Sequence, residues 1–286
     1  MKNKLYLSMG ALVERRNGFD TGEVARTIPR LMSEGHIDGA EFMFIKAYYG
    51  GAVSLIRSLR AEGCVFPTFH TDKDIGARLS DAGVLAPADA KEATRIRGEA
   101  LDMFRYNCET AAEGSSPRLV LHLWGGLNSD CAVDFNISCL GELIAIAKDF
   151  GVRIMVENVP STLRDPLTNW RAMSGRLGEV GLVFDTRFAT CHRQPKETLE
   201  DSAVFPHIEH VHVSDYRGGL KEFSHLRPVF HPGEGIADLP LIFSHLKEHN
   251  YSGSFTLESP GIVGEGPEID LDNLKRSLSF IKDHME

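Results

Sequence analysis

Histidine, aspartate and glutamate residues end six successive apolar segments of this sequence. They are His70, His122, Glu157, Asp185, His212 and Glu258. Imidazole and carboxylate groups bind metal ions and transfer protons, so a site that gathers them can do both. One charged residue at the end of an apolar segment is common, because polar groups often lie near the ends of buried strands. Six in succession indicate a shared site.

Three of these residues are acidic, and three carboxylates in one buried site repel one another. Each uncompensated buried charge costs several kcal/mol, so either protons or a cation must neutralise the group. Glu157, Asp185, His212 and Glu258 together offer three carboxylates and an imidazole, which suit one divalent metal ion. This oxygen-rich set favours Mn²⁺ or Mg²⁺, and Co²⁺, Fe²⁺ and Zn²⁺ are alternatives.

His70 and His122 allow two interpretations. They could hold a second metal ion by sharing Glu157, or they could remain neutral and form hydrogen bonds to substrate oxygens. We favour the second interpretation, because a histidine outside a ligand cluster more often acts as a hydrogen-bonding group.

Eight short apolar runs alternate with longer segments of helical periodicity. The runs are near-continuously hydrophobic, as expected for parallel strands that are covered on both sides. The predicted strands are Leu5–Met9, Ala40–Ile45, Cys64–Phe69, Leu119–Leu123, Arg153–Val156, Gly181–Phe184, Ile208–Val213 and Ser254–Leu257. The predicted helices are Thr21–Ser33, Ala52–Ala61, Ala88–Ala112, Cys139–Phe150, Leu167–Leu177, Asp238–His249 and Leu271–Asp283, with a weaker, short helix within 186–207.

This alternation predicts an α/β fold, a single (β/α)₈ TIM barrel that spans residues 1–286 as one domain. A doubly wound open sheet would need a glycine-rich Gly-x-Gly-x-x-Gly turn after its first strand, and residues 8–12 read Ser-Met-Gly-Ala-Leu instead. Glu157, Asp185 and His212 follow one another at intervals of 28 and 27 positions. These intervals are close to the roughly 31 residues per unit of a ~250-residue barrel.

Equivalent positions on neighbouring barrel strands converge at one end, so the six side chains are expected to share a pocket. The loops that follow the strands build this face. We expect two long ones, at residues 71–87 and 216–236.

The composition of the chain limits the classes of partner that it is expected to bind. The formal net charge is −9, and no run of Lys and Arg stands out, which argues against nucleic acid or an anionic membrane as the main partner. The five cysteines include no Cys-x-x-Cys pair, and no apolar stretch approaches the ~20 residues needed to span a bilayer. The interrupted apolar run near the start favours a first strand over a signal peptide. We expect a cytoplasmic protein, and a homo-oligomer is compatible with the sequence.

Four strings at the predicted strand ends resemble the xylose isomerase-like TIM barrel superfamily. They are Val156-Glu157-Asn158-Val159-Pro160, Phe184-Asp185-Thr186, His210-Val211-His212-Val213-Ser214-Asp215, and His231-Pro232-Gly233-Glu234-Gly235 with Leu257-Glu258-Ser259. The superfamily contains sugar-phosphate isomerases, ketose 3-epimerases, hydroxypyruvate isomerase, inosose dehydratase and endonuclease IV-type nucleases. The resemblance implies one metal ion held by Glu157, Asp185, His212 and Glu258. It also implies that Glu157 and Glu258 transfer protons on either face of the substrate.

The sequence departs from the family pattern at one position. Family members commonly carry a His three residues after the strand-six Asp, where this chain has Phe188. In the nucleases that His holds a third zinc together with an Asp-x-His pair, which residues 227–232 lack. In epimerases this histidine contacts the substrate, so its absence also makes this sequence a poorer match to an ordinary ketose 3-epimerase. His192 and Arg187 are the candidates to replace it.

The resemblance and the residues together predict a metal-dependent isomerase or epimerase of a small sugar, polyol ketone or sugar phosphate. The ion would act as a Lewis acid while a glutamate transfers a proton through an enediolate. A dehydratase is the first alternative, followed by an endonuclease IV-like phosphodiesterase and a non-catalytic sugar-binding protein.

Further residues are predicted to contact the substrate or to support the site. His70, His122, Asn158, Arg217 and Glu234 are the predicted substrate contacts. The guanidinium of Arg217 would also suit a phosphate. Asp215 is predicted to orient a ligand or a substrate group.

Overall fold

Eight parallel strands close into a barrel in the order β1 to β8, with β1 hydrogen-bonded to β8. The computed structural model describes residues 3–178 and 180–285, so four residues of the predicted domain 1–286 lie outside it. The strands are β1 Lys4–Ser8, β2 Gly39–Met43, β3 Thr68–His70, β4 Arg118–Leu121, β5 Arg153–Glu157, β6 Gly181–Asp185, β7 Ile208–Val213 and β8 Ser254–Leu257. The predicted TIM barrel is confirmed.

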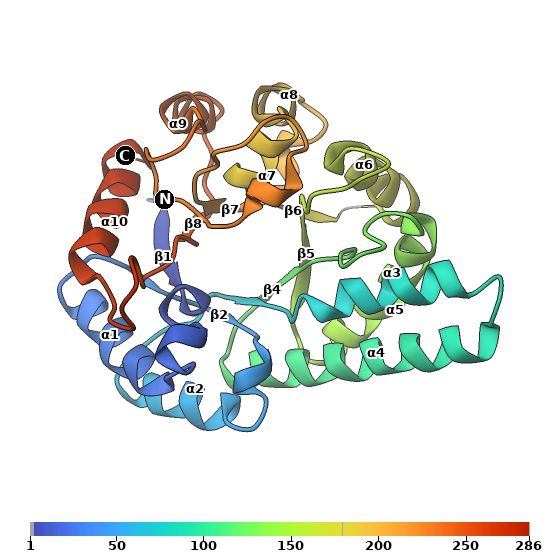
Figure 1. The fold of residues 1–286 in the computed structure, drawn as a ribbon, viewed down its shortest axis with the longest axis horizontal. Coiled ribbons are helices and arrows are strands. Elements are labelled where there is room, and N and C mark those ends of the chain that lie inside the picture. The colour runs from blue at the N-terminus through green and yellow to red at the C-terminus, as the bar shows by residue number, and fades with distance from the viewer. Residues whose placement is uncertain (1–2, 179, 286) are drawn as a thin grey trace.

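Helices surround the strands on the outside of the barrel (Figure 1). They are α1 Thr21–Ser33, α2 Ala52–Ala61, α3 Asp74–Leu85, α4 Ala90–Glu113, α5 Val133–Asp149, α6 Pro166–Leu177, α7 Thr186–Cys191, α8 Pro195–Glu200, α9 Leu239–Glu248 and α10 Leu271–Met285. Short 3₁₀ helices are η1 Met9–Leu12, η2 Arg15–Asn17, η3 Lys46–Tyr48, η4 Phe205–His207 and η5 Phe223–Leu226. Within the described ranges, no helix combines the length and apolar character needed to cross a membrane.

The third predicted strand was too long. β3 covers only Thr68–His70, whereas the apolar run begins at Cys64. Pro67 stands between them and has no backbone N–H to donate to a strand ladder. The fourth predicted strand, Leu119–Leu123, also extended too far. β4 ends at Leu121, so His122 follows the strand instead of lying within it.

The prediction of a long loop at residues 71–87 was wrong, because helix α3 occupies most of that segment. Ile75, Leu79 and Ala82 are fully buried on this helix. α3 packs against both α4 and α5 as an additional layer outside the barrel, visible at the right of Figure 1. This packing supplies the burial that a helix of only 12 residues needs, since short helices are marginal in isolation.

The other helices show how far periodicity alone defines a boundary. α1 and α2 have their predicted bounds, whereas α5 begins at Val133, before the predicted Cys139. The first turns of α5 contain Asn136, whose buried side chain donates to Leu123 O at 2.9 Å. A polar residue with that role interrupts the apolar pattern from which helices are predicted.

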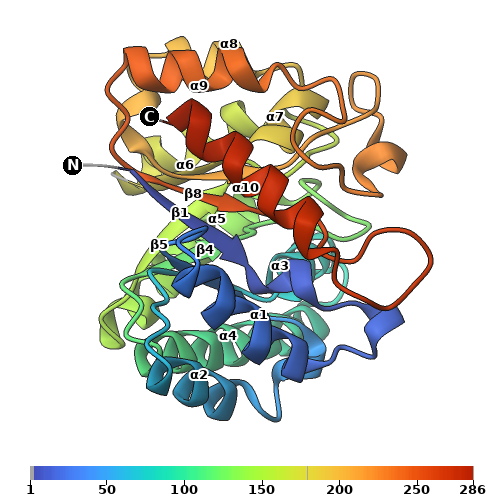
Figure 2. The same cartoon turned by 90° about the vertical axis from the view of Figure 1, so that its left-hand side faces the viewer.

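Successive side chains of each strand point alternately into and out of the barrel, so the inward-facing residues are two positions apart. Two residues before Glu157 and Asp185 lie Met155 and Val183, which form a small apolar cluster with Val120. This cluster closes the barrel beneath the strand ends. In Figure 2 the loops that follow β1, β7 and β8 gather on the right, at the carboxyl ends of the strands. The predicted site residues lie at that end.

Gly76 makes the close approach of α3 to the barrel possible. A Cβ atom at this position would lie 2.3 Å from the carbonyl oxygen of His122, a backbone atom that cannot move aside easily. We expect Gly76→Ala to lower the free energy of unfolding by about 1–3 kcal/mol through overpacking. The matched control is Gly98→Ala in α4, where a Cβ would meet nothing within 4 Å. That substitution should stabilise the helix by up to about 1 kcal/mol. Urea unfolding of both variants measures the difference, and equal stability of the two would contradict this account.

Candidate metal centre and pocket

Four of the predicted residues meet at the carboxyl ends of β5 to β8. Glu157, Asp185, His212 and Glu258 each offer one ligand atom, and these atoms lie within 4.8 Å of one another. Strand register explains the meeting, because Asp185 pairs with His212 between β6 and β7 and Val213 pairs with Leu257 between β7 and β8. The side chains of Glu157, Asp185 and His212 are fully buried, and that of Glu258 is 6% exposed.

The two carboxylate oxygens of Asp185 have different surroundings. Oδ1 accepts a hydrogen bond of 2.7 Å from the backbone N–H of Phe188 and so caps helix α7. Oδ2 is buried without a hydrogen-bond partner, and so is Oε1 of Glu258, which lies 3.4 Å from His212 Nδ1. Buried carboxylate oxygens normally have partners. Two orphaned oxygens in a set of four ligand residues therefore fit a bound cation.

Burial raises the pKa of the Asp185 carboxyl to about 7. The positive charge of Arg187 opposes this shift, and the negative charges of Glu157 and Glu258 add to it. Arg187 Nη2 lies 3.7 Å from Asp185 Oδ2, too far for a hydrogen bond. Without a cation, this carboxyl therefore holds a proton at and below neutral pH.

Glu157 is surrounded by imidazoles. His212 Nδ1 donates to its Oε1 at 2.7 Å, and His122 Nε2 and His70 Nε2 both approach its Oε2, the latter at 3.3 Å. Burial alone would raise the pKa of Glu157, but the positive charge of His212 and the contacts with His122 hold it well below its usual range. His122 itself has its pKa lowered to about 4, mainly by burial, and is therefore neutral at physiological pH.

His70, His122 and Glu157 form a second group whose ligand atoms lie within the same 4.8 Å limit. His70 Nδ1 lies 2.7 Å from the carbonyl oxygen of Thr71, which can only accept, so this nitrogen carries a proton. His70 Nε2 then faces the carboxylate oxygen Oε2 of Glu157 at 3.3 Å. This contact is favourable where a proton or a cation lies between the two atoms.

Glu41 is the site residue that sequence reasoning missed. It lies on β2, is fully buried, and accepts a hydrogen bond from His212 Nε2 at 3.3 Å, with His210 Nε2 at 3.2 Å. Burial would raise its pKa, but the charge of His212 and the two imidazole contacts lower it. Glu41 thereby fixes the ring of His212 with Nδ1 towards the cluster. The available signal was one acidic residue inside an otherwise apolar run, Gly39–Met43.

The side chains of Asn158 and Asp215 form hydrogen bonds to backbone groups. The Asn158 side chain accepts from Asp185 N at 2.7 Å and donates to Asp185 O at 3.2 Å, which joins the ends of β5 and β6. Asp215 accepts the backbone N–H groups of Gly233, Gly235 and Ala237 at 2.9–3.0 Å. Both side chains organise the site through the backbone, and in this structure their polar atoms are used in these contacts.

Glu234 and Arg217 also lie apart from the metal cluster. Both are exposed. Glu234 Oε2 accepts from His231 N at 3.0 Å, and the Arg217 guanidinium lies over the ring of Phe230 at 4.3 Å. Neither residue is among those that line the two cavities described next. Their predicted substrate contacts stay predictions.

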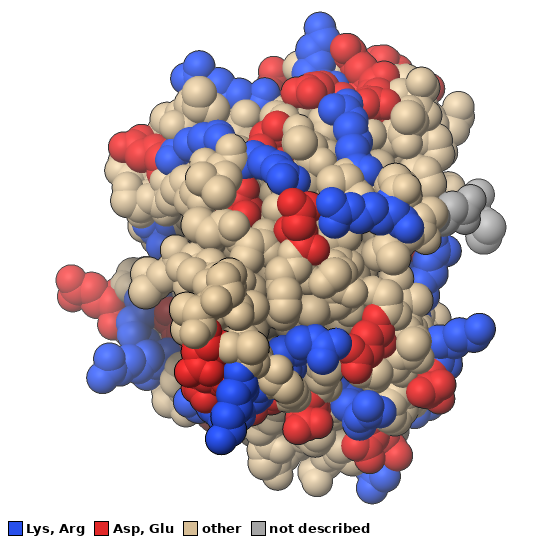
Figure 3. All heavy atoms as spheres, turned by 90° about the vertical axis from the view of Figure 1, so that its right-hand side faces the viewer, with Lys and Arg blue, Asp and Glu red and all other residues tan. Residues whose placement is uncertain are grey.

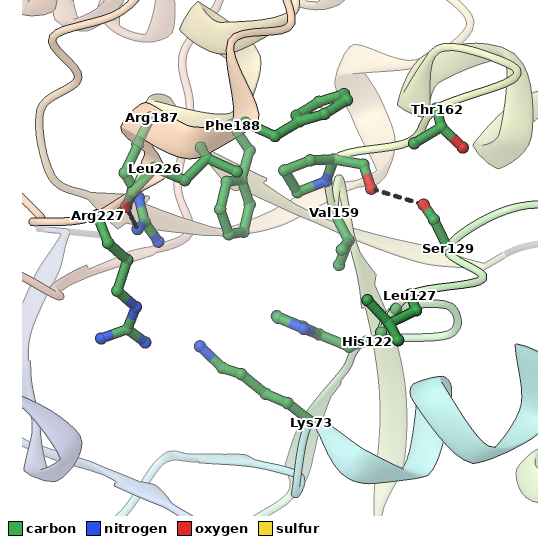
Figure 4. A pocket seen from close by; sticks show the side chains of 14 residues that line it. Lys73, His122, Leu127, Ser129, Val159, Thr162, Arg187, Phe188, Leu226 and Arg227 are labelled. Atoms are coloured by element: carbon green, nitrogen blue, oxygen red, sulfur yellow. Dashed lines mark hydrogen bonds between the residues drawn. The ribbon is translucent and has the colours of Figure 1, made fainter.

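Two adjoining cavities open above the cluster. The larger, of about 380 Å³, includes His122 and Phe188 in its wall, and the smaller, of about 110 Å³, includes Glu258. Lys73, Arg187 and Arg227 line both cavities, and Figure 4 shows their side chains reaching into the space beside His122. The pocket is therefore acidic at its floor and basic at its rim.

Phe188 stands where many family members have a histidine, and Arg187 is the residue that faces the pocket beside it. The Arg187 guanidinium lies 4.5 Å from the centre of the Phe188 ring. The alternative candidate, His192, instead accepts a hydrogen bond of 3.2 Å from Ser161 N and contacts Phe223.

The sequence model described as xylose isomerase-like TIM barrel matches residues 38–284. Two uncharacterized proteins of Methanocaldococcus jannaschii are related in sequence. One is 30% identical over 198 residues, which cover 62% of this chain and 62% of that protein. The other is 26% identical over 191 residues, which cover 64% of this chain and 70% of that protein. The chain thus covers less than two thirds of the length of the first relative.

Several solved structures have a similar fold. A D-tagatose 3-epimerase-like protein superposes with a TM-score of 0.67 at 19% identity, covering 99% of this chain and 97% of that chain. D-allulose 3-epimerase from Methylomonas sp. gives 0.72 at 16% identity, covering 99% and 98%. The 3-keto-D-glucoside 4-epimerase of E. coli gives 0.67 at 18% identity, covering 99% and 100%.

The raised pKa of Asp185 predicts a pH-dependent effect of metal on stability. Because the folded-state pKa lies above the ordinary value of 3.8 for an aspartate, the apo protein loses stability as the pH rises towards and through 7. A cation that replaces the proton should then raise Tm more at about pH 8 than at about pH 5.5. Differential scanning fluorimetry with and without Mn²⁺ measures this. Asp185→Asn should stabilise the apo protein at the higher pH and remove the metal effect. An equal gain in wild-type Tm at both pH values would refute the prediction.

The contact between Glu41 and His212 predicts a role in metal affinity. Glu41→Gln removes the charge that orients the imidazole, and such changes next to a ligand typically weaken metal binding by about 10–100-fold. Calorimetric titration with Mn²⁺ measures the Kd. Glu109→Gln, at an exposed position on α4, is the control for the loss of one negative charge. The role assigned to Glu41 fails if both variants bind the metal like the wild type.

Proposed function

The chain belongs to the xylose isomerase-like TIM barrel family, and on that premise we propose that it is a divalent-metal-dependent isomerase or epimerase of a small sugar, polyol ketone or sugar phosphate. The observation that carries the proposal is the pair of buried, partnerless carboxylate oxygens on Asp185 and Glu258, next to a cavity that Glu258 lines. The similarity of fold to proteins named as sugar epimerases or as epimerase-like supports the substrate class.

Glu157, Asp185, His212 and Glu258 would hold the ion, and their three carboxylates favour Mn²⁺ or Mg²⁺. When bound, a divalent ion supplies Lewis-acid stabilisation of the negative charge that develops on the substrate carbonyl. The grouping of His70, His122 and Glu157, whose ligand atoms lie within 4.8 Å of one another, would allow a second ion in place of the hydrogen-bonding role of these histidines. This is the interpretation that the sequence left as the alternative.

The two glutamates are not equivalent in the structure, and this supports a division of roles. Glu258 borders the cavity and has a free Oε1, whereas the side chain of Glu157 is fully buried and engaged by three histidines. Glu258 is therefore the group that removes a proton from the carbon next to the carbonyl. Return of the proton at another carbon gives isomerisation. Epimerisation requires return on the opposite face, the role proposed for Glu157.

His122 lines the cavity and is neutral, so its imidazole can bind a substrate hydroxyl, and His70 lies behind it against Glu157. The same enediolate chemistry would serve a dehydratase if a β-hydroxyl leaves. That lyase activity is the second candidate, supported by the cavity residues that both reactions share.

The net charge of −9 gives little support to a nucleic-acid substrate. On the flank of the barrel shown in Figure 3, lysine and arginine side chains are interspersed with aspartate and glutamate. Phe188 also occupies the position at which nucleases of the family have a zinc-binding histidine. We therefore rank a phosphodiesterase below the sugar-converting enzymes.

Exchange of substrate protons with solvent tests the proposal directly. The Mn²⁺-loaded protein is incubated in D₂O with a panel of ketoses, inososes and their phosphates, and deuterium incorporation next to the carbonyl is followed by NMR. We expect exchange with one substrate class, lost on chelation of the metal. Glu258→Gln should slow it by about 10²–10⁴-fold, as expected for loss of a positioned general base.

Glu265→Gln is the matched control, because it makes the same chemical change at an exposed position of the loop that follows β8. It should exchange at the wild-type rate. The NMR spectra also separate the candidates, since a dehydratase product lacks one hydroxyl group. Absence of exchange across the panel in metal-loaded protein, or wild-type exchange by Glu258→Gln, would remove the proton-transfer mechanism.

A further inference from the structure

Resting on the proposed function, we propose that Lys73, Arg187 and Arg227 form an anion subsite, so that the natural substrate is a sugar carrying a phosphate or carboxylate group. The three cations come from three separate segments of the chain. Lys73 precedes α3, Arg187 lies in the first turn of α7, and Arg227 follows η5 in the loop between β7 and α9. Figure 4 shows that the side chains extend from opposite sides into one space.

Two of these cations have no acidic partner. Among the residues of 3–178 and 180–285, neither Lys73 nor Arg227 has a carboxylate oxygen within 4.0 Å, whereas Arg95 and Arg30 on helices α4 and α1 form ion pairs with neighbouring glutamates. Lys73 is half-buried and lines the same cavity as His122. An unpaired ammonium at the rim of a pocket is placed to meet an anion.

Arg187 supplies the second, independent observation. Its side chain is only 7% exposed, and its Nε–H is buried without a hydrogen-bond partner. Nη1 donates to the carbonyl oxygen of Leu226 at 3.0 Å, which fixes the guanidinium plane at the cavity wall. A buried guanidinium with an unused donor is costly unless an acceptor is present. Planar oxyanions such as carboxylate, and phosphate oxygens, match this donor geometry.

The acidic residues around the cavity leave most of this positive charge unbalanced, although Asp185 Oδ2 lies 3.7 Å from Arg187 Nη2. Glu14, which lines the smaller cavity, forms an ion pair with Arg16 at 2.5 Å. Glu258 belongs to the metal cluster below. The protein as a whole carries a net charge of −9, so this concentration of positive charge is local and not a general property of the surface.

The cations and the proposed reacting groups share the same two cavities. The reacting carbons must lie near Glu258 and His122, and Lys73, Arg187 and Arg227 line the walls of these cavities. The larger cavity, of about 380 Å³, has a volume suited to a small ligand. The subsite thus fits an anionic group on a substrate of monosaccharide size, either a phosphate ester or a sugar acid.

Binding of unreactive probes tests the subsite separately from catalysis. D-Glucitol, D-glucitol 6-phosphate and D-gluconate lack the carbonyl group, and their Kd values for the Mn²⁺-loaded protein are measured by calorimetry. We expect at least one anionic probe to bind about tenfold or more tightly than D-glucitol, as hydrogen bonds to charged groups allow. Arg227→Met and Lys73→Met should each reduce this preference several-fold. Arg105→Met, on the exposed face of α4, removes one positive charge elsewhere and should leave the preference unchanged.

The choice between the two anionic probes identifies the source of the anion. Tighter binding of D-glucitol 6-phosphate indicates a sugar phosphate, and tighter binding of D-gluconate indicates a sugar acid. Equal or undetectable binding of all three probes, or an unchanged preference in Arg227→Met and Lys73→Met, would overturn the proposal. Anion preference without deuterium exchange in any substrate would instead leave the subsite standing and reject the proposed proton-transfer function.

Discussion

The structure depends on one electrostatic constraint, which is the burial of three carboxylates at the same end of a closed barrel. The negative charge of each carboxylate is accommodated differently. Glu157 is surrounded by imidazoles, Asp185 has a pKa raised to about 7, and Glu258 keeps a free oxygen at the cavity wall. Because the buried imidazoles leave two carboxylate oxygens without partners, a divalent cation is the simplest species that balances the set.

Much of the surrounding polar structure holds these groups in place and is not free to bind a ligand. Glu41 orients His212 from the far side of the ring. Asn158 joins the ends of two strands through the backbone of Asp185, and Asp215 gathers three backbone N–H groups of the following loop. A strand end presents a side chain in a defined direction only if its own backbone is fixed, so these contacts are a condition for the site.

Charges of both signs meet in the pocket. Carboxylates and histidines lie at the strand ends, and Lys73, Arg187 and Arg227 come from the segments that follow the strands. Phe188 adds an apolar surface to the larger cavity and packs against the Arg187 guanidinium. The groups proposed for proton transfer and those proposed for anion binding thus come from different parts of the fold.

The sequence by itself determined the barrel and the group of Glu157, Asp185, His212 and Glu258. Regular β–α spacing fixes where each strand ends, and parallel register then brings those ends together. The sequence did not determine α3, because that helix depends on packing against α4 and α5. It also did not determine the role of Glu41, because only the closed barrel brings this β2 side chain into contact with His212 on β7. The loop residues were also decided by tertiary structure. Arg217 and Arg227 are arginines of the same long loop, but only Arg227 lines the two cavities, and loops carry no periodicity from which that difference follows.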